Sequence, residues 1–194
     1  MKHFLHFIII AIMFCMVGCA HPINITPSLD TYTSEGSTKI EKNVGYYISP
    51  YDLAKEVVTP AGGGDKVKYL PYKESEPVLK KVLSNRFANV FMISSLEDRE
   101  FILSNKITYI FVPTIETNSS SRSSWIWPPS DFTISIYCKG MDSSGNEIWQ
   151  TTVRGESHLG LPQVAREHAL AAKRATQDVF SALFQEIVKA ESLR

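Results

Sequence analysis

The sequence has no excess of charge of either sign, since 20 Lys and Arg residues stand against 20 Asp and Glu residues. Proteins that bind nucleic acid usually carry a clustered basic surplus, so this balance argues against a nucleic-acid partner. The chain also lacks the Gly-x-Ser-x-Gly elbow of many hydrolases and the His-Glu-x-x-His motif of zinc proteases. Without a catalytic signature, we predict that the protein is not an enzyme and has no catalytic residue, metal or cofactor.

Long apolar runs are also scarce, and the one that occurs lies at the amino terminus, from Phe4 to Met16. It is shorter than the roughly 20 residues that a spanning helix needs. A short basic start, an apolar run and a small residue at its end are typical of a secretory signal peptide. We therefore predict that residues 1–18 are a signal peptide. The alternatives are an uncleaved anchor and a plain signal that is cut without further modification.

The end of this run, Met16-Val17-Gly18-Cys19, resembles the lipobox of bacterial lipoproteins, with Met16 at the position where Leu is commonest. The resemblance implies that the signal is cut before Cys19, that the thiol of Cys19 is diacylated and that its new amino group is acylated. Several acyl chains anchor a protein stably in a bilayer. It further implies the outer membrane, facing the periplasm, because Ala20 is not the Asp that favours retention in the inner membrane.

Cysteine is rare, with only Cys15, Cys19 and Cys138 in the chain. If Cys15 leaves with the signal and Cys19 is acylated, Cys138 has no partner for an intramolecular disulfide. Cys138 is in phase with Ile134 and Ile136 in an alternating pattern. We expect it to be a small buried side chain on the core face of a strand, the alternative being a reactive thiol.

The rest of the chain divides into two parts. Residues 19–42 are rich in Ser, Thr and Pro and weakly hydrophobic, which predicts a lipidated Cys followed by a flexible tether. Residues 43–194 are long enough for a single domain with a real core. Its two histidines, His158 and His168, lack a zinc motif and are expected to be solvated.

Within the domain, the periodicity of apolar residues predicts alternating strands and helices. Residues 51–59 fit either a short helix or a strand. Asp142-Ser143-Ser144-Gly145-Asn146 is typical of a hairpin turn. We predict strands over 44–48, 66–70, 90–93, 107–116, 132–141 and 147–155, and helices over 74–88, 96–104 and 163–190.

Two amphipathic helices and a mixed sheet pack most economically as a two-layer α+β sandwich, with a mostly antiparallel sheet and both helices on one face. From residue 70 onward this order resembles the small α/β domains of the TolB amino-terminal domain and the lipoproteins PelC and CsgG. The resemblance implies an assembly or export role with other envelope proteins as partners, and it is compatible with a homo-oligomer. It contains no shared catalytic motif.

The loop between two of the strands is unusual, because a Ser-rich stretch leads into Trp125-Ile126-Trp127-Pro128-Pro129. If exposed, these side chains offer rigid amphipathic area of the kind that anchors protein interfaces or lies at a membrane surface. We therefore take Trp125, Ile126, Trp127, Pro128 and Pro129 as candidate partner-binding residues. The alternative is that they fold back over a sheet edge or a helix end.

These observations favour a non-enzymatic interaction or assembly module of the bacterial envelope, attached to the bilayer through Cys19. Two other functions stay open. A periplasm-facing carrier of a lipid or small apolar ligand would need an apolar cavity between sheet and helices. A hydrolase of envelope polymers would need acids or His assembled in space into a cleft.

Overall fold

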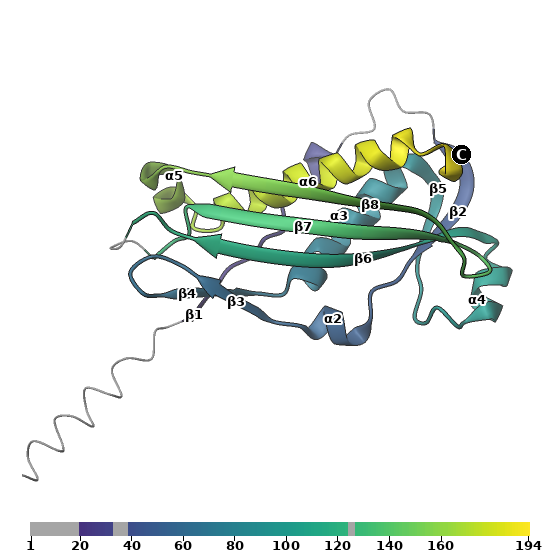
Figure 1. The fold of residues 1–194 in the computed structure, drawn as a ribbon, viewed down its shortest axis with the longest axis horizontal. Helices are drawn as coiled ribbons and strands as arrows, with labels where there is room; N and C mark the ends of the chain where they lie inside the picture. Colours follow the sequence, from purple (N-terminus) through teal and green to yellow (C-terminus); the bar gives the residue numbers. More distant parts are fainter. Residues whose placement is uncertain (1–19, 33–38, 124–126) are drawn as a thin grey trace, which may run out of the picture.

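A five-stranded sheet forms the centre of the structure, in the order β5-β2-β6-β7-β8 (Figure 1). The computed structural model describes residues 20–32, 39–123 and 127–194. β2 is parallel to β5 and β6, whereas β6, β7 and β8 form an antiparallel meander. The strands of this sheet are β2 (Ile40–Tyr46), β5 (Phe87–Met92), β6 (Ile107–Ser120), β7 (Asp131–Asp142) and β8 (Glu147–His158).

Two helices, α3 (Pro71–Arg86) and α6 (Leu170–Lys189), cover one face of this sheet (Figure 1). The strict alternation of β7 explains which face they cover, because every second side chain from Phe132 to Cys138 is fully buried beneath them. Leu183 of α6 is fully buried in the same core. The predicted two-layer α+β sandwich is therefore confirmed, as is the buried position of Cys138.

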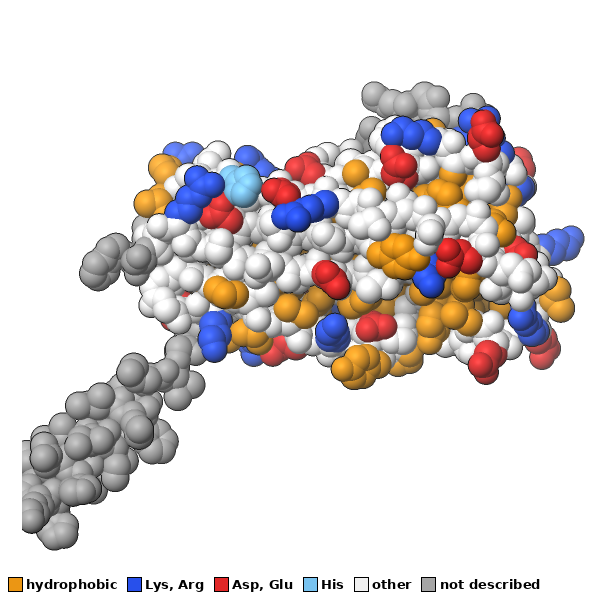
Figure 2. Space-filling model, in the orientation of Figure 1, with side chains coloured by type: hydrophobic (Ala, Val, Ile, Leu, Met, Phe, Trp, Pro, Cys, Tyr) orange, Lys and Arg blue, Asp and Glu red, His pale blue; other side chains and the backbone are white. Residues whose placement is uncertain are grey.

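The opposite face of the sheet is covered only at one end, by α4 (Arg99–Ser104). Ile102 of α4 packs there against Ile93, Ile107 and Ile110, which form a small second core. Farther along the strands this face is largely polar (Figure 2). None of the helices in the described ranges is long and apolar enough to cross a membrane.

The helix expected over 163–190 is in fact two helices, α5 (Leu161–Arg166) and α6. Glu167 ends α5 with an extended backbone, at φ −142° and ψ 104°, which interrupts the helical hydrogen bonds. The undecided segment 51–59 also contains two elements, the short helix α2 (Pro50–Ala54) and the strand β3 (Val57–Pro60). Two single-turn 3-10 helices, η1 (Leu29–Thr31) and η2 (Glu191–Leu193), complete the fold.

A second sheet of three strands, in the order β1-β4-β3, was not expected from the sequence. Its central strand is β4 (Lys66–Tyr69), which pairs antiparallel with β3 and parallel with β1 (Ala20–Pro22). Ala20 lies opposite Lys66 in this register. Ala20 is therefore already part of the folded unit.

The flexible tether expected over residues 19–42 is consequently wrong for residues 20–32, which belong to the folded unit, and for residues 40–42, which begin β2. Ile25 is fully buried, and its N–H donates to the Glu74 carboxylate at 2.7 Å. The Tyr32 carbonyl accepts from the Asn85 amide at 2.9 Å. A few apolar side chains in an otherwise polar stretch are enough to hold it, because each reaches the main core. Cys19 and residues 33–38 lie outside the described residues.

Candidate functional site

One end of the molecule, which we call the β1 end, brings together four segments that are distant in sequence (Figure 1). They are the start of β1, the β3–β4 turn, the loop after β6 and the segment that follows β8. Trp127 lies in the loop after β6 and contacts each of the other three. Its carbonyl accepts from the Gly62 N–H at 3.0 Å, and its ring contacts His21 and His168.

The Trp127 ring lies between the two imidazoles. It stacks on His21 with a centroid distance of 4.2 Å and an interplanar angle of 24°, and it meets His168 edge-on at 4.6 Å. His21 Nε2 also approaches Asp65 Oδ2 to 3.3 Å, an ion-pair contact without hydrogen-bond geometry. Trp127 is half-buried against the main core. It therefore holds β1 and the α5–α6 junction to the loop.

This arrangement corrects the expectation of a free aromatic arm. Pro128 and Pro129 are buried, so the alternative, that this part of the loop folds back onto the domain, holds for Trp127, Pro128 and Pro129. A pair of prolines has no N–H to leave unsatisfied when it is buried. Trp125 and Ile126 lie outside the described residues, and their role in binding a partner stays a prediction.

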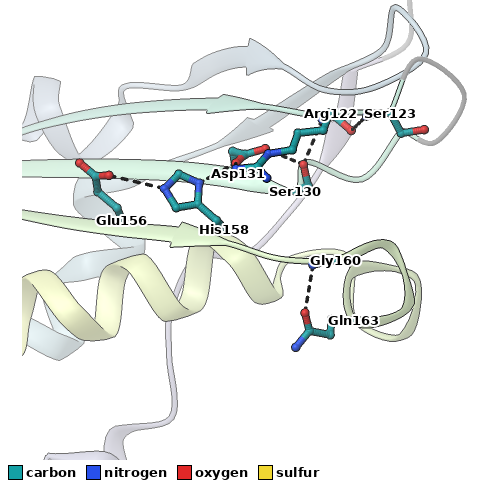
Figure 3. Close-up of polar contacts among 9 residues, drawn as sticks. Arg122, Ser123, Ser130, Asp131, Glu156, His158, Gly160 and Gln163 are labelled. Atoms are coloured by element: carbon teal, nitrogen blue, oxygen red, sulfur yellow. Dashed lines mark hydrogen bonds and ion pairs between the residues drawn. The ribbon is translucent and has the colours of Figure 1, made fainter.

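Next to this loop, Asp131 is the centre of a polar cluster at the first residue of β7 (Figure 3). His158 Nδ1 lies 2.6 Å from Asp131 Oδ1, and the Ser130 hydroxyl donates to Asp131 Oδ2 at 2.6 Å. The Arg122 guanidinium lies 3.3 Å from Asp131 Oδ1. On the far side, His158 Nε2 lies 3.6 Å from Glu156, which also pairs with Arg154.

The charge state of Asp131 follows from these contacts. Partial burial by itself would raise the pKa of Asp131, but the hydrogen bonds from Ser130 and His158 and the charge of Arg122 outweigh it and hold the pKa below its ordinary value. Asp131 is therefore ionised at neutral pH. A fixed carboxylate in this position ties together the loop, the start of β7 and the end of β8.

Although Ser, Asp and His meet here, their order does not fit nucleophilic catalysis. A catalytic serine must give its proton to the imidazole, which the carboxylate orients from the other side. Here the Ser130 hydroxyl is directed to Asp131, and Ser130 is only 2% exposed. The backbone N–H of Arg122 also donates to Ser130 Oγ at 3.1 Å, which fixes the hydroxyl as a structural bridge.

The expectation for the two histidines is partly wrong. His168 is exposed, but its ring packs on Trp127. His158 is about half-exposed and is held between Asp131 and Glu156, rather than being freely solvated. Counting back from the turn without a bulge would place Asp131 opposite Ser157. A β-bulge between Gly140 and Met141 shifts the register by one residue, and Asp131 therefore lies opposite His158. Within the described ranges, no group of His, Cys, Asp and Glu is arranged to hold a metal ion.

Beside the Asp131 cluster there is a cavity of about 610 Å³. It lies at the end of the sheet, not between the sheet and the helices. Its apolar part comes from Leu159 and Leu161, and its polar part from Arg122 and His158. Among the described residues, the lining consists of Arg122, Ser123, Ser130, His158, Leu159, Gly160 and Leu161. Burial of Cys138 beneath the helices raises the pKa of its thiol to about 12, so this group takes no part in thiolate chemistry.

No protein-family model and no curated protein matches this chain. Among solved structures, the chain is similar in fold to protein XCC0632 of the DUF330 family from Xanthomonas campestris, with a TM-score of 0.50 and 12% identity over 87% of this chain and 92% of that one. A similarity at this identity concerns the fold alone.

Two other solved structures align less well. One is a PelC dodecamer from Paraburkholderia phytofirmans, with a TM-score of 0.42 and 15% identity over 74% of this chain and 94% of that one. The other is a homolog of the neuraminyllactose-binding hemagglutinin from Helicobacter pylori, with a TM-score of 0.41 and 10% identity over 84% of this chain and 96% of that one.

Proposed function

We propose that this protein is a bacterial envelope lipoprotein that acts as a non-enzymatic interaction or assembly module. Cys19 carries the lipid and holds the domain in the outer membrane on the periplasmic side. Other envelope proteins are its partners. One observation carries the proposal: Met16-Val17-Gly18-Cys19 has the residue pattern of a lipobox, and the residues before it have the composition of a signal peptide.

A binding role is favoured over hydrolysis by the geometry of the Asp131 cluster. A hydrolase of envelope polymers would need a nucleophile or a water beside an available base. The Ser130 hydroxyl is directed to the Asp131 carboxylate, and His158 is engaged by acidic groups on both of its ring nitrogens. The side chains of Ser130, Asp131 and His158 thus hold the loop in place, which suits a rigid scaffold.

A carrier of a small amphipathic ligand is the second candidate, and the cavity beside the cluster favours it. Its volume of about 610 Å³ is within the range of small-molecule sites. Leu159 and Leu161 would contact an apolar group, and Arg122 an anionic one. Leu161→Trp would narrow the cavity. Native mass spectrometry of the purified protein with and without Leu161→Trp would show whether a co-purified ligand is lost.

The replacement Cys19→Ala tests the main proposal. We expect the precursor to stay uncleaved or mislocalised, because signal removal in lipoproteins depends on the modified thiol. Mass spectrometry of the amino-terminal peptide and membrane fractionation would measure this. Cys15→Ala is the matched control, since it removes a thiol from the predicted signal and should leave processing intact. Normal acylation and fractionation of the Cys19→Ala protein would contradict the proposal.

Partner binding needs a second measurement. Affinity isolation from crosslinked membranes should recover the same envelope protein with wild type and Cys15→Ala, and less of it with Cys19→Ala, because the unanchored domain is no longer held at the membrane. Multi-angle light scattering of the detergent-solubilised protein would establish whether several copies associate. A protein that stays monomeric and enriches no envelope protein would contradict the module.

A further inference from the structure

The position of β1 fixes the distance between the domain and its lipid. β1 runs inward from the β1 end: Ala20 pairs with Lys66, and the chain then reaches the buried Ile23 and Ile25. Consecutive Cα atoms are about 3.8 Å apart. An acylated Cys19 would therefore place the lipid within one residue of a hydrogen-bonded strand, with no slack between the bilayer and the fold.

Basic and apolar side chains lie around the start of β1, as on protein surfaces that contact phospholipid. Leu161 of α5 is 42% exposed, and Lys66 and Arg166 are exposed on β4 and α5. Arg122, in the neighbouring loop, exposes 74% of its side chain, although Asp131 neutralises part of its charge. Figure 2 shows basic and apolar side chains together at this end, over α5.

Besides Asp131, two acidic side chains at the β1 end lie beside basic ones. Asp65 lies against His21, and Glu167 pairs with Lys173 at 2.6 Å. At the opposite end of the sheet, Glu97 and Glu100 are exposed beside α4 together with Arg99 and Lys106, and Glu147 pairs with Lys139 at 3.5 Å. An anionic bilayer would therefore attract the exposed cations of the β1 end more than the mixed charges of the other end.

Resting on the proposed acylation of Cys19, we infer that the domain stands end-on to the membrane. The surface formed by Lys66, Arg122, Leu161 and Arg166 lies on the anionic phospholipid headgroups, and the hairpin turn and α4 point away from the bilayer. The short connection holds this surface close to the lipid, and Lys66, Arg166 and Leu161 set its orientation.

Fluorescence quenching in vesicles tests this orientation. Leu161→Cys and Leu103→Cys each place one reactive thiol on an exposed site, the first at the β1 end and the second on α4, where Leu103 is 70% exposed. The buried Cys138 and the acylated Cys19 would not compete for label. The full lipidated protein is reconstituted in phosphatidylethanolamine–phosphatidylglycerol vesicles containing a lipid with a nitroxide headgroup. We expect quenching several-fold stronger at position 161 than at position 103.

Charge reversal supplies the matched comparison. Lys66→Glu with Arg166→Glu should weaken quenching at position 161, whereas Lys55→Glu with Lys80→Glu makes the same charge change at exposed sites away from the β1 end and should not. Unchanged quenching in the first variant would overturn the assignment of these two cations. Equal quenching at positions 161 and 103 would overturn the orientation itself.

The two proposals fail in different ways. The mass of the amino-terminal peptide is measured before reconstitution. A peptide without acyl chains contradicts the lipoprotein function, and an acylated protein with equal quenching at both positions contradicts only the end-on orientation.

Discussion

Gly155 of β8 lies directly under the backbone of α6, so that a Cβ placed on it would be 2.1 Å from the carbonyl oxygen of Ala175. The nearest atoms of Val179 would be no farther than 3.0 Å. The helix and the strand are therefore in contact through their main chains, and a side chain at this position would have to move backbone.

The first prediction concerns this contact. Gly155→Ala should lower the free energy of unfolding by at least about 2 kcal/mol, because overpacking against backbone cannot be relieved by a rotamer change. Urea denaturation would measure the loss. Gly160→Ala is the control, since its nearest neighbour would be 3.7 Å away and its φ of −77° suits any residue. Equal stability of the two variants would show that α6 lies farther from the sheet.

The second prediction concerns the apolar side of the same helix. Leu183 is fully buried, and Leu183→Ala should cost on the order of 2–5 kcal/mol through lost contacts and the cavity that remains. Leu103→Ala makes the same chemical change at a site that is 70% exposed and should change stability little. Thermal melts followed by circular dichroism would compare them. A wild-type melting temperature for Leu183→Ala would refute the packing.

The third prediction follows from the position of Trp127 between two imidazoles. Trp127→Ala should cost about 1–3 kcal/mol, because it removes a half-buried ring and both of its aromatic contacts. This expectation reverses that of a free binding arm, for which truncation would leave stability intact. Tyr51→Ala removes an aromatic ring that is 78% exposed and serves as the control. Differential scanning calorimetry would separate the two outcomes.

The fourth prediction is a dependence on pH. The pKa of Asp131 is held below its unfolded value, which is about 3.9. The ionised carboxylate therefore stabilises the fold fully above that value, and this contribution disappears as the pH falls through the lower folded-state pKa. Asp131→Asn should be less stable than wild type at neutral pH, and the difference should shrink below about pH 4.

Urea midpoints of wild type and Asp131→Asn, measured at neutral and acidic pH, would test this. Asp30→Asn, at an exposed position of η1, should be close to wild type throughout. A deficit of Asp131→Asn that is the same at both pH values would mean that the charge of Asp131 is not what stabilises the loop.

The longest elements were predictable from the sequence because their patterns are set by their own residues. The alternation from Phe132 to Cys138 and the turn at Asp142 defined the hairpin. The stripe containing Leu183 defined the closing helix. The small sheet was not predictable in the same way, because β1 and β3 are too short to show a period. Their strand conformation depends on β4, a tertiary partner.

The candidate site was predictable only in part, for a related reason. The sequence shows that Trp127 offers a large aromatic surface. Whether its ring faces solvent or the domain depends on His21 and His168, which contact it from distant segments. The Asp131–His158 pair was not available from the turn alone, because a β-bulge between Gly140 and Met141 shifts the hairpin register by one residue. Cys19, Trp125 and Ile126 lie outside the described residues, so lipidation and partner binding at these positions stay predictions.

The early start of β1 also sets an order of events during export. A peptidase that cuts before Cys19 must bind the adjacent chain in an accessible, extended form, and Ala20 and Pro22 cannot be in its active site while β1 is paired with β4. The proposed maturation would therefore take place while the edge of β4 is still open. Docking of β1 would therefore follow processing, and the finished small sheet would mark a chain that has already been cut.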